Sequence, residues 1–506
     1  MQAQSTRRMR VRQRPSRPID RHQVQDLLWP KTAGPVFRQR SVRAETLQRQ
    51  PVTADGGLAL AHHLAMRLGL DRSINRHLHL LRFHLPYHES DHVLTHAYNL
   101  FVGGRDIEDI QSLQHSPAVK NLLGACRVPD PTTAGDFLRR LGPEDLDALQ
   151  RAIDEGRIKV WRKMPRSERR SITLDMDSSF KKVYGVCKQG AEFSYQKQWS
   201  YHPLLFTLAE TAEPLRLVNR PGNRPSAEGA AELLGLCLKM LTENFDEVFL
   251  RGDSKFSERA ILRQAVEHHA LFAIVQQMDL PIWGAAFHLP EAAWKPLRAK
   301  PGSRFHPTSG CIRRKRVRHR SRIARRRGYR TLSTVREWVA EIPYRLEGFD
   351  RPLRLVFKRQ WIREDRQLSF QTHYEYRAVI TNIPRWRMSP SAIVHFAYGR
   401  CNQENAIEQA KNGLAAMRMP TGQLRANGAF LLAAEIAWCL RAWLSLLALP
   451  RETRTWEWGW FRRAFVHAPA VIIRRAHSAV VRFHASHRFA AYLLAASERL
   501  RGLQFG

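Results

Sequence analysis

The chain has 506 residues, which is too long for one hydrophobic core and predicts two to four domains. Its 82 Lys and Arg residues against 46 Asp and Glu residues give a formal net charge of +36, and so basic a polypeptide repels itself unless it binds a polyanion. Nucleic acid is the first candidate partner, and an anionic membrane surface is the second, although no basic amphipathic anchor stands out.

Cysteine usage and hydropathy narrow the class of protein further. The six cysteines are scattered, with no Cys-x-x-Cys pair and no Cys/His zinc spacing, so we expect no zinc site and a reducing compartment. The N-terminus is polar and arginine-rich and lacks the apolar core of a signal peptide. The longest apolar stretch, Phe430–Leu449, contains Glu435 and Arg441, which favours a buried helix over a membrane span.

The N-terminal third of the chain divides into a basic arm and a helical region. Residues 1–50 carry closely spaced Arg and Pro residues, which predict a loosely ordered arm that lies on DNA or only solubilises the chain. In residues 51–165 the apolar residues recur with helical spacing, with one helix stopping at Gly69 and another over Asp91–Val102. We expect this helical region to bind DNA, although it could be only a scaffold.

The hydrophobic period changes near residue 171 and predicts an α/β unit over residues 166–280. Ile172, Leu174 and Met176 alternate with polar residues, as in a strand buried on one face. Strands followed by a helix and a further strand are typical of an α/β sheet. The other elements expected here are strands at Glu192–Tyr195, Pro203–Leu208, Glu247–Leu250 and Leu271–Val275 and a helix at Ala227–Leu241.

Residues 281–385 differ in composition and predict a β-rich basic insertion. Strand-like runs at Leu353–Lys358 and Tyr374–Ile380 accompany a dense arginine stretch, which we expect to follow the DNA backbone. The candidate DNA-binding residues of this stretch are Arg313, Arg314, Arg316, Arg318, Arg325 and Arg326. Trp338 could stack on a flipped base, but packing in a small β core is the commoner role of such a residue.

The pattern is helical again beyond residue 385. We expect residues 386–450 to complete the α/β unit and residues 451–506 to form a C-terminal region that contributes dimer contacts, with a strand at Val480–Phe483.

A helix over residues 396–413 would place Arg400, Glu404 and Lys411 on one stripe, at about 100° per residue. An acid between two cations suits phosphodiester chemistry, in which a carboxylate binds a metal ion and the cations bind phosphate. The simpler alternative is a salt-bridged helix surface worth roughly 0.2–0.5 kcal/mol per pair.

Three upstream acids supply the partners that Glu404 would need. Asp175 and Asp177 end the first predicted strand, and alternation along the strand puts both on one face. Asp253 follows a later strand, at the end of the sheet where α/β sheets bind ligands. With Glu404 these acids could hold two Mg²⁺ or Mn²⁺ ions about 3.5–4 Å apart. Each acid alone has a simpler explanation as a turn, N-cap or salt-bridge residue.

Several segments together resemble a known family. LDMDSS around Asp177, FLRGDSKF around Asp253 and RCNQENAIEQAKNG from Arg400 resemble the DDE transposases of bacterial insertion sequences, in the group named after insertion sequence four and especially its thirteen-eighty relatives. The third segment resembles the family's Tyr-Arg-Glu-Lys signature, with Tyr398 one place later than the family's tyrosine. The segment QLRAN, which contains Arg425, is also similar.

The resemblance implies an α/β fold with a ribonuclease H-like catalytic core, interrupted by the β-rich insertion and flanked by helical N-terminal DNA-binding and C-terminal regions. It implies that Asp177, Asp253 and Glu404 are the catalytic metal ligands, with Asp175 as the rival for the first place. Arg400 and Lys411 would contact phosphates beside the cleaved bond.

The implied activity is metal-dependent cleavage of double-stranded DNA at transposon terminal inverted repeats, followed by strand transfer into target DNA. A homodimer holding two ends in a synaptic complex, in the bacterial cytoplasm on the nucleoid, is expected. Tyr398 and Arg425 would contact DNA.

Two alternatives remain open. A metal-dependent nuclease could use the same core without strand transfer. A non-enzymatic DNA-binding protein derived from a transposase would need only the positive charge, and its acids need not converge.

Overall fold

A computed structural model describes residues 50–505 apart from 186, 195–196, 299–331, 365–372, 400 and 477, and the side chains of 332–335, 362–364, 373 and 401–404 are also outside it. Residues 51–506 form one contact unit, separate from residues 1–50. The basic arm and the candidate residues Arg313 to Arg326 therefore lie outside the described residues.

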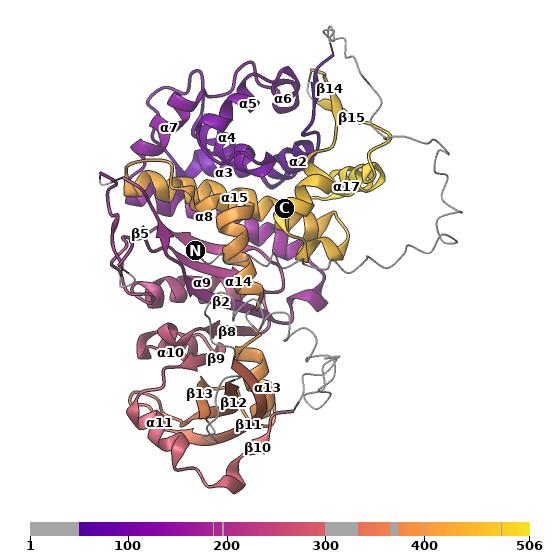
Figure 1. The fold of residues 1–506 in the computed structure, drawn as a ribbon. Coiled ribbons are helices and arrows are strands. Elements are labelled where there is room, and N and C mark those ends of the chain that lie inside the picture. Colours follow the sequence, from indigo (N-terminus) through magenta and orange to yellow (C-terminus); the bar gives the residue numbers. More distant parts are fainter. Residues whose placement is uncertain are drawn as a thin grey trace, which may run out of the picture. The chain divides into compact units, whose positions relative to one another are not determined.

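The central element is a nine-stranded mixed sheet with the order β10-β11-β12-β13-β9-β8-β2-β6-β7 (Figure 1). β2 is parallel to β8 and β8 to β9, and the other neighbouring pairs are antiparallel. Its strands are β2 (Ile172–Ser178), β6 (Leu204–Leu208), β7 (Pro214–Val218), β8 (Val248–Gly252), β9 (Leu271–Gln276), β10 (Lys295–Pro296), β11 (Leu332–Tyr344), β12 (Leu353–Glu364) and β13 (His373–Thr381).

Two small sheets and the helices complete the described part of the chain. The small sheets have the orders β1-β14-β15 and β3-β5-β4. Their strands are β1 (Val52–Thr53), β3 (Lys181–Lys182), β4 (Glu192–Phe193), β5 (Trp199–Tyr201), β14 (Ala470–Arg474) and β15 (Ala479–Phe483). The α-helices are α2 (Leu58–Leu68), α3 (Leu70–His77), α4 (Glu89–Val102), α5 (Gln111–Gln114), α6 (Pro117–Leu123), α7 (Pro131–Arg140), α8 (Pro143–Lys163), α9 (Ala230–Asn244), α10 (Arg259–Glu267), α11 (Leu280–Phe287), α13 (Pro390–Ala397), α14 (Cys401–Glu408), α15 (Leu424–Leu447), α16 (Trp458–Phe461) and α17 (Ala490–Gly502).

The alternating sequence of β2 is explained by its two different faces. Ile172, Leu174 and Met176 are fully buried in an apolar core with residues of α9 and α10. Successive side chains of a strand point to opposite faces, so the polar residues of β2 lie on the other side of the sheet. The predicted strands and helix of this unit are present within a few residues of their expected bounds, except that the strand expected at Glu192 shortens to β4. The elements β3, β5, β7 and α10 were not predicted from the sequence.

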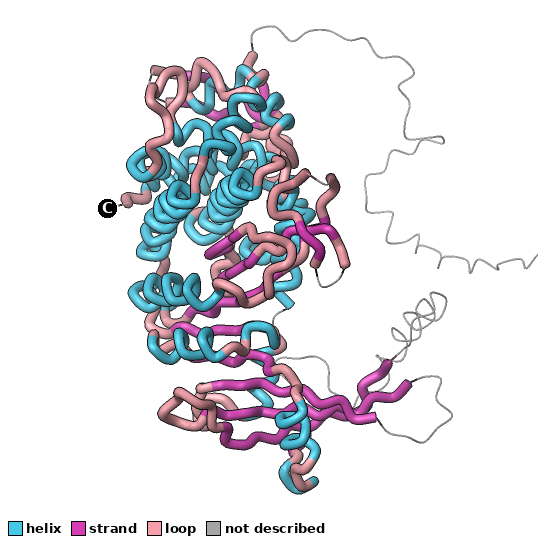
Figure 2. Tube along the Cα trace, turned by 90° about the vertical axis from the view of Figure 1, so that its left-hand side faces the viewer, coloured by secondary structure: helices cyan, strands magenta, loops and turns pink. Residues whose placement is uncertain are grey.

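The predicted β-rich insertion is present, but it extends the central sheet instead of standing apart. β13 pairs with β9, with Val379 opposite Val275 and Ile380 opposite Ile274. β10, β11 and β12 follow outward from β13. Figure 2 shows these long strands stacked below those of the α/β unit. The insertion is therefore joined by backbone hydrogen bonds between β13 and β9 to the α/β unit that it interrupts.

The two ends of the described chain meet in the helical region. β1 pairs with β14, and β14 with β15, which confirms the strand expected at Val480–Phe483. Leu58 of α2 and Leu493 of α17 belong to the same buried core. Residues 451–506, for which we expected dimer contacts, thus make extensive contacts within their own chain.

The longest apolar segment forms the buried helix α15, as predicted. By length and composition α15 could cross a membrane, but 89% of its most apolar window is buried inside the protein. The two charged residues in the buried part of α15 have partners: Arg441 lies over the rings of Trp458 and Phe461, with its Cζ 5.6 and 5.2 Å from their centroids, and Glu435 enters an ion network. A core helix of a folded domain fits these facts.

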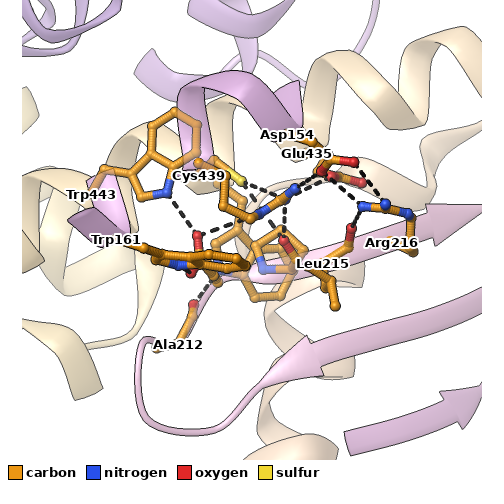
Figure 3. Close-up of polar contacts among 12 residues, drawn as sticks. Asp154, Trp161, Ala212, Leu215, Arg216, Glu435, Cys439 and Trp443 are labelled. Atoms are coloured by element: carbon orange, nitrogen blue, oxygen red, sulfur yellow. Dashed lines mark hydrogen bonds and ion pairs between the residues drawn. The ribbon is translucent and has the colours of Figure 1, made fainter. Parts of the chain in front are cut away.

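An ion network centred on the fully buried Arg157 joins α8 and α15 to β7 (Figure 3). Arg157 of α8 has no exposed surface; it donates to Glu435 Oε1 at 2.9 Å and to the Pro214 carbonyl at 2.8 Å, and it also pairs with Asp154. Glu435 Oε2 accepts the Leu217 N–H at 3.1 Å.

The indole groups of two tryptophans complete this network. Glu213 accepts the Nε1–H of Trp161 at 2.6 Å and that of Trp443 at 2.7 Å, and its Oε2 lies 3.6 Å from Arg157 Nε. Because Arg157, Glu213 and Glu435 are all fully buried, these ions stabilise the fold only while all three are present.

Replacing Arg157 by Met should destabilise the protein strongly. Glu213 and Glu435 would remain buried without a counter-charge, and breaking a buried ion pair in this way costs about 3–5 kcal/mol. Urea denaturation followed by circular dichroism measures the loss. Arg162→Met, at an exposed position of the same helix, is the matched control and should change the free energy of unfolding by no more than about 0.5 kcal/mol; equal effects of the two variants would contradict the assignment.

Candidate active site

The carboxyl ends of β2 and β8 bring two of the predicted acids together. The parallel register pairs Asp175 with Arg251 and Met176 with Gly252, so the next residues along the two strands are Asp177 and Asp253. Neighbouring strands lie about 4.8 Å apart. Both acids are half-buried. The sheet therefore presents two carboxylates side by side at one edge.

Asp175 is already paired within the protein. Its side chain is 1% exposed, and its two oxygens accept Arg251 Nε at 2.6 Å and Nη2 at 2.7 Å. Such a bidentate pair is among the strong charge-assisted contacts. Metal ligation by Asp175 would require breaking it and leaving Arg251 buried without a counter-charge, so the geometry favours Asp177 as the ligand from β2.

Asp177 and Asp253 also make local backbone contacts. Asp177 Oδ1 accepts the Ser178 N–H at 2.7 Å. Asp253 is the N-cap of the 3-10 helix η3 (Ser254–Phe256), where its Oδ1 accepts the Lys255 N–H at 2.8 Å. The simple N-cap interpretation of Asp253 is thus correct. It is compatible with metal binding because a carboxylate has two oxygens and about four lone-pair sites.

The continuous helix expected over residues 396–413 is wrong. α13 ends at Ala397, α14 begins at Cys401, and the segment Gln409–Gly413 is a π-helix, η5. A Cβ at Gly399, between α13 and α14, would lie 3.0 Å from the His395 carbonyl oxygen, which shows how closely the chain folds there. A stripe drawn at a constant angle per residue therefore does not apply, and π-helical turns are frequent at functional sites.

α14 nevertheless lies over the polar face of β2. Asn405, Ala406 and Gln409 line a cavity of about 110 Å³ together with Asp175 and Thr207. Arg400 and the side chain of Glu404 lie outside the described residues, while the backbone of α14 at 404 is described. The described neighbours of Glu404 thus place its helix beside the strand that carries Asp175 and Asp177.

Lys411 reaches the same strand end from η5. Its Nζ donates to Ser179 Oγ at 2.5 Å. Burial lowers the pKa of Lys411, although the carboxylates of Glu408 and Asp177 oppose that shift. Lys411 therefore lies close to Asp177, even though the helical segment that carries it is irregular.

Further cations gather beside Lys411. The pKa of Lys181 is lowered by burial and then by the nearby charges of Arg418, Lys411 and Lys188. Lys188 has a lowered pKa for the same two reasons, burial and Arg418, and its Nζ donates to the Met419 carbonyl at 2.5 Å. Mutual repulsion of this kind is relieved by a bound polyanion, so the neighbourhood favours phosphate groups.

The other described DNA-binding candidates contact parts of the protein other than the strand ends that carry Asp177 and Asp253. Tyr398 is in the turn after α13, and its ring centre lies 5.5 Å from Lys358 Nζ and 5.9 Å from Arg377 Cζ of the insertion strands. Burial raises the pKa of Tyr398. Trp338 packs against Arg359, whose Cζ lies 4.9 Å from the centre of the Trp338 ring. This contact corresponds to the packing role that was expected from the sequence as the commoner alternative to base stacking. Arg425 is exposed in the first turn of α15.

Sequence reasoning missed Arg251 and the two lysines Lys181 and Lys188. A signal for Arg251 existed: it lies two residues before Asp253, so alternation puts it on the same strand face as the acids. The lysines had no comparable signal, because β3 and the loop that follows it meet η5 only in three dimensions.

Asp175 and Asp177 should respond differently to the same substitution. Asp175→Asn leaves Arg251 buried without a counter-charge and should lower the free energy of unfolding by about 3 kcal/mol. Asp177→Asn, at a half-buried position, should lower it by less than about 1 kcal/mol. Chemical denaturation of both variants measures the difference. Adding Arg251→Met to Asp175→Asn should restore part of the loss; a larger effect at Asp177 would contradict the structural role of Asp175.

A protein-family model matches most of the chain. The family described as transposase DDE domain group 1 matches residues 35–505. No curated protein matches the sequence. A solved structure of a piggyBac transposase synaptic complex with hairpin DNA is similar with 10% identity and a TM-score of 0.30, over 80% of this chain and 86% of that chain. A likeness at that level supports no conclusion about this chain.

Proposed function

The chain belongs to the transposase DDE domain group 1 family, and we propose that it is a DNA transposase that cuts transposon ends and joins them to target DNA. One observation carries the proposal: in the register of β2 and β8 Asp177 lies beside Asp253. The helix α14, which carries Glu404, borders a cavity together with Asp175 of the same strand β2. The net charge of +36 provides for a polyanionic substrate.

The topology supports a ribonuclease H-like core. β2, β6 and β7 are consecutive antiparallel neighbours, and β8 and β9 follow in parallel on the other side of β2, with α9 and α10 between the later strands. This order and direction agree with the core that the sequence resemblance implies. The insertion strands β10 to β13 fall between Asp253 and Glu404, as that resemblance also implies. Together with the resemblance of the three sequence segments, this topology supports our proposal that the chain is a member of the insertion-sequence-four group and its thirteen-eighty branch.

The described donors fit a hard divalent cation. Asp177 and Asp253 offer carboxylate oxygens at one half-buried edge, and Mg²⁺ and Mn²⁺ prefer such ligands. We assign Asp177, Asp253 and Glu404 as the residues that would hold two ions. When bound, the ions supply activation of the attacking hydroxyl and stabilisation of the leaving oxygen.

The protein's own side chains have separate tasks in this proposal. Lys411, whose Nζ contacts Ser179 just after β2, binds and orients the phosphate next to the cleaved bond. Arg400, which lies outside the described residues, is proposed for the same task. Lys181 and Lys188 hold the neighbouring backbone. Asp175 acts as a positioning residue, because its pairing with Arg251 fixes the strands that carry the acids.

The DNA partner is double-stranded and comprises transposon terminal inverted repeats and a target. The helical region recognises the ends, and the arginine stretch from Arg313 to Arg326 follows the backbone. Arg425 and Tyr398 are further DNA contacts, and Trp338 has the packing role. A homodimer holding two ends in the bacterial cytoplasm completes the proposal.

Removing any acid of the proposed triad should abolish cleavage. We expect Asp177→Asn, Asp253→Asn and Glu404→Gln each to reduce cleavage of end-bearing DNA in Mg²⁺ or Mn²⁺ by roughly three orders of magnitude, since metal stabilisation of the transition state is worth several kcal/mol. Gel analysis of labelled DNA measures the rate, and fluorescence anisotropy should show DNA binding retained.

The matched control for this experiment is Glu408→Gln. Glu408 is an exposed acid on the same helix as Glu404, and its substitution should leave cleavage within about twofold, a free-energy difference of roughly 0.4 kcal/mol. Cleavage that survives Asp253→Asn or Glu404→Gln would overturn the active-site assignment.

Strand transfer separates a transposase from a nuclease with the same core. Pre-cleaved ends with free 3′-hydroxyls, incubated with supercoiled target and Mg²⁺, should yield joined products with wild-type protein and none with Asp177→Asn. Cleavage of uncut ends without any joining of pre-cleaved ends would favour the nuclease and count against the transposase.

A further inference from the structure

A second group of metal-ligand side chains lies at the beginning of α4, in the helical region. His84, His88 and Glu89 each offer one ligand atom, and these atoms lie within 4.8 Å of one another. His84 and His88 are exposed, and their rings stack with centroids 4.8 Å apart and planes inclined by 4°. None of the three belongs to the site proposed for phosphodiester chemistry.

Glu89 is the unusual member of this group. Its side chain is only 1% exposed, and its Oε1 accepts the N–H groups of Leu80 at 3.1 Å and Leu81 at 3.0 Å. Its Oε2 is also buried but has no hydrogen-bond partner among the described residues. A buried carboxylate oxygen without a donor is costly, so its position calls for a cation.

This oxygen faces His84, with which it forms an ion pair when the imidazole is protonated, although it accepts no hydrogen bond among the described residues. Glu89 Oε2 lies 3.4 Å from His84 Nε2. Two ligand atoms of a tetrahedral zinc ion, each about 2.0–2.1 Å from the metal, are themselves about 3.4 Å apart. The other distances between the three ligand atoms are at most 4.8 Å and must shorten to about 3.4 Å when zinc binds. Rotation of the exposed imidazoles can bring the atoms together.

Hydrogen bonds from neighbouring groups hold Glu89 and the backbone of His88 in place. The two N–H donors of Leu80 and Leu81 orient the Glu89 carboxylate, as outer partners do in metal sites. The His88 N–H donates to Asp91 Oδ2 at 2.8 Å, which holds the backbone at the start of α4.

We propose that His84, His88 and Glu89 bind a zinc ion, with water as the fourth ligand. Two imidazoles and one carboxylate form a known zinc ligand set, whereas Mg²⁺ prefers oxygen ligands alone. Cysteine spacing predicts no zinc site, but this site needs no cysteine. The ion ties the loop before α4, including the exposed Phe83 and Leu85, to the helical region.

Zinc titration of the untagged full-length protein tests the proposal. Protein stripped with chelator is titrated by calorimetry in excess Mg²⁺, which occupies the oxygen-only site. We expect one Zn²⁺ per chain, a rise in Tm on binding, and Co²⁺ absorption bands of tetrahedral coordination. His84→Ala and His88→Ala should each weaken binding at least about tenfold.

Two controls keep this result separate from the proposed catalysis. His79→Ala, at an exposed position of the same segment, should bind zinc like wild type. Asp177→Asn should also bind zinc normally, because it alters only the other site. Absence of zinc binding, equal binding by the His84→Ala/His88→Ala double variant, or an equal loss in His79→Ala would overturn the zinc site and leave the transposase proposal untouched.

Discussion

The buried ion network around Arg157 is the constraint on which the described fold depends. Arg157 comes from α8, Glu435 from α15 and Glu213 from the turn before β7, so three distant stretches of chain must meet for any one charge to be compensated. Removing a partner leaves a charge in an interior that cannot solvate it. The network thus fixes α15 and the N-terminal helices against the edge of the central sheet.

This fixed frame determines what reaches the candidate active site. α14 and η5 precede α15 directly in the chain, so anchoring α15 on β7 limits where α14 can lie over β2. A second buried pair, Asp175 with Arg251, ties β2 to β8. The two half-buried acids beyond that pair are therefore held by neighbours that are not themselves expected to bind metal, as a preorganised site requires.

The electrostatics of the candidate site follow from the same arrangement. Burial lowers the pKa of Lys181, Lys188 and Lys411, which come from two parts of the chain, and the charges of Lys411 and Lys188 lower the pKa of Lys181 further. Cations crowded in this way raise the free energy of the DNA-free protein and are relieved by phosphate. At Lys411 the carboxylates of Glu408 and of the proposed metal ligand Asp177 oppose the shift in pKa.

The sequence by itself determined the parts of this protein that depend on local pattern. Alternation along Ile172–Met176 predicted β2, and charged Glu435 within an apolar run predicted a buried helix. Asp177 and Asp253 were identifiable because acids at strand ends have a common chemical use. What the tertiary structure decided were relations between distant residues. Asp175 and Asp177 are equivalent by alternation, and only the contact with Arg251 distinguishes them. The break at Gly399 and the π-helical turn at Lys411 depend on packing against the sheet, since no local period encodes them. The pairing of β1 with β14 and the approach of His84 to Glu89 likewise arise from contacts that the chain makes only once it has folded.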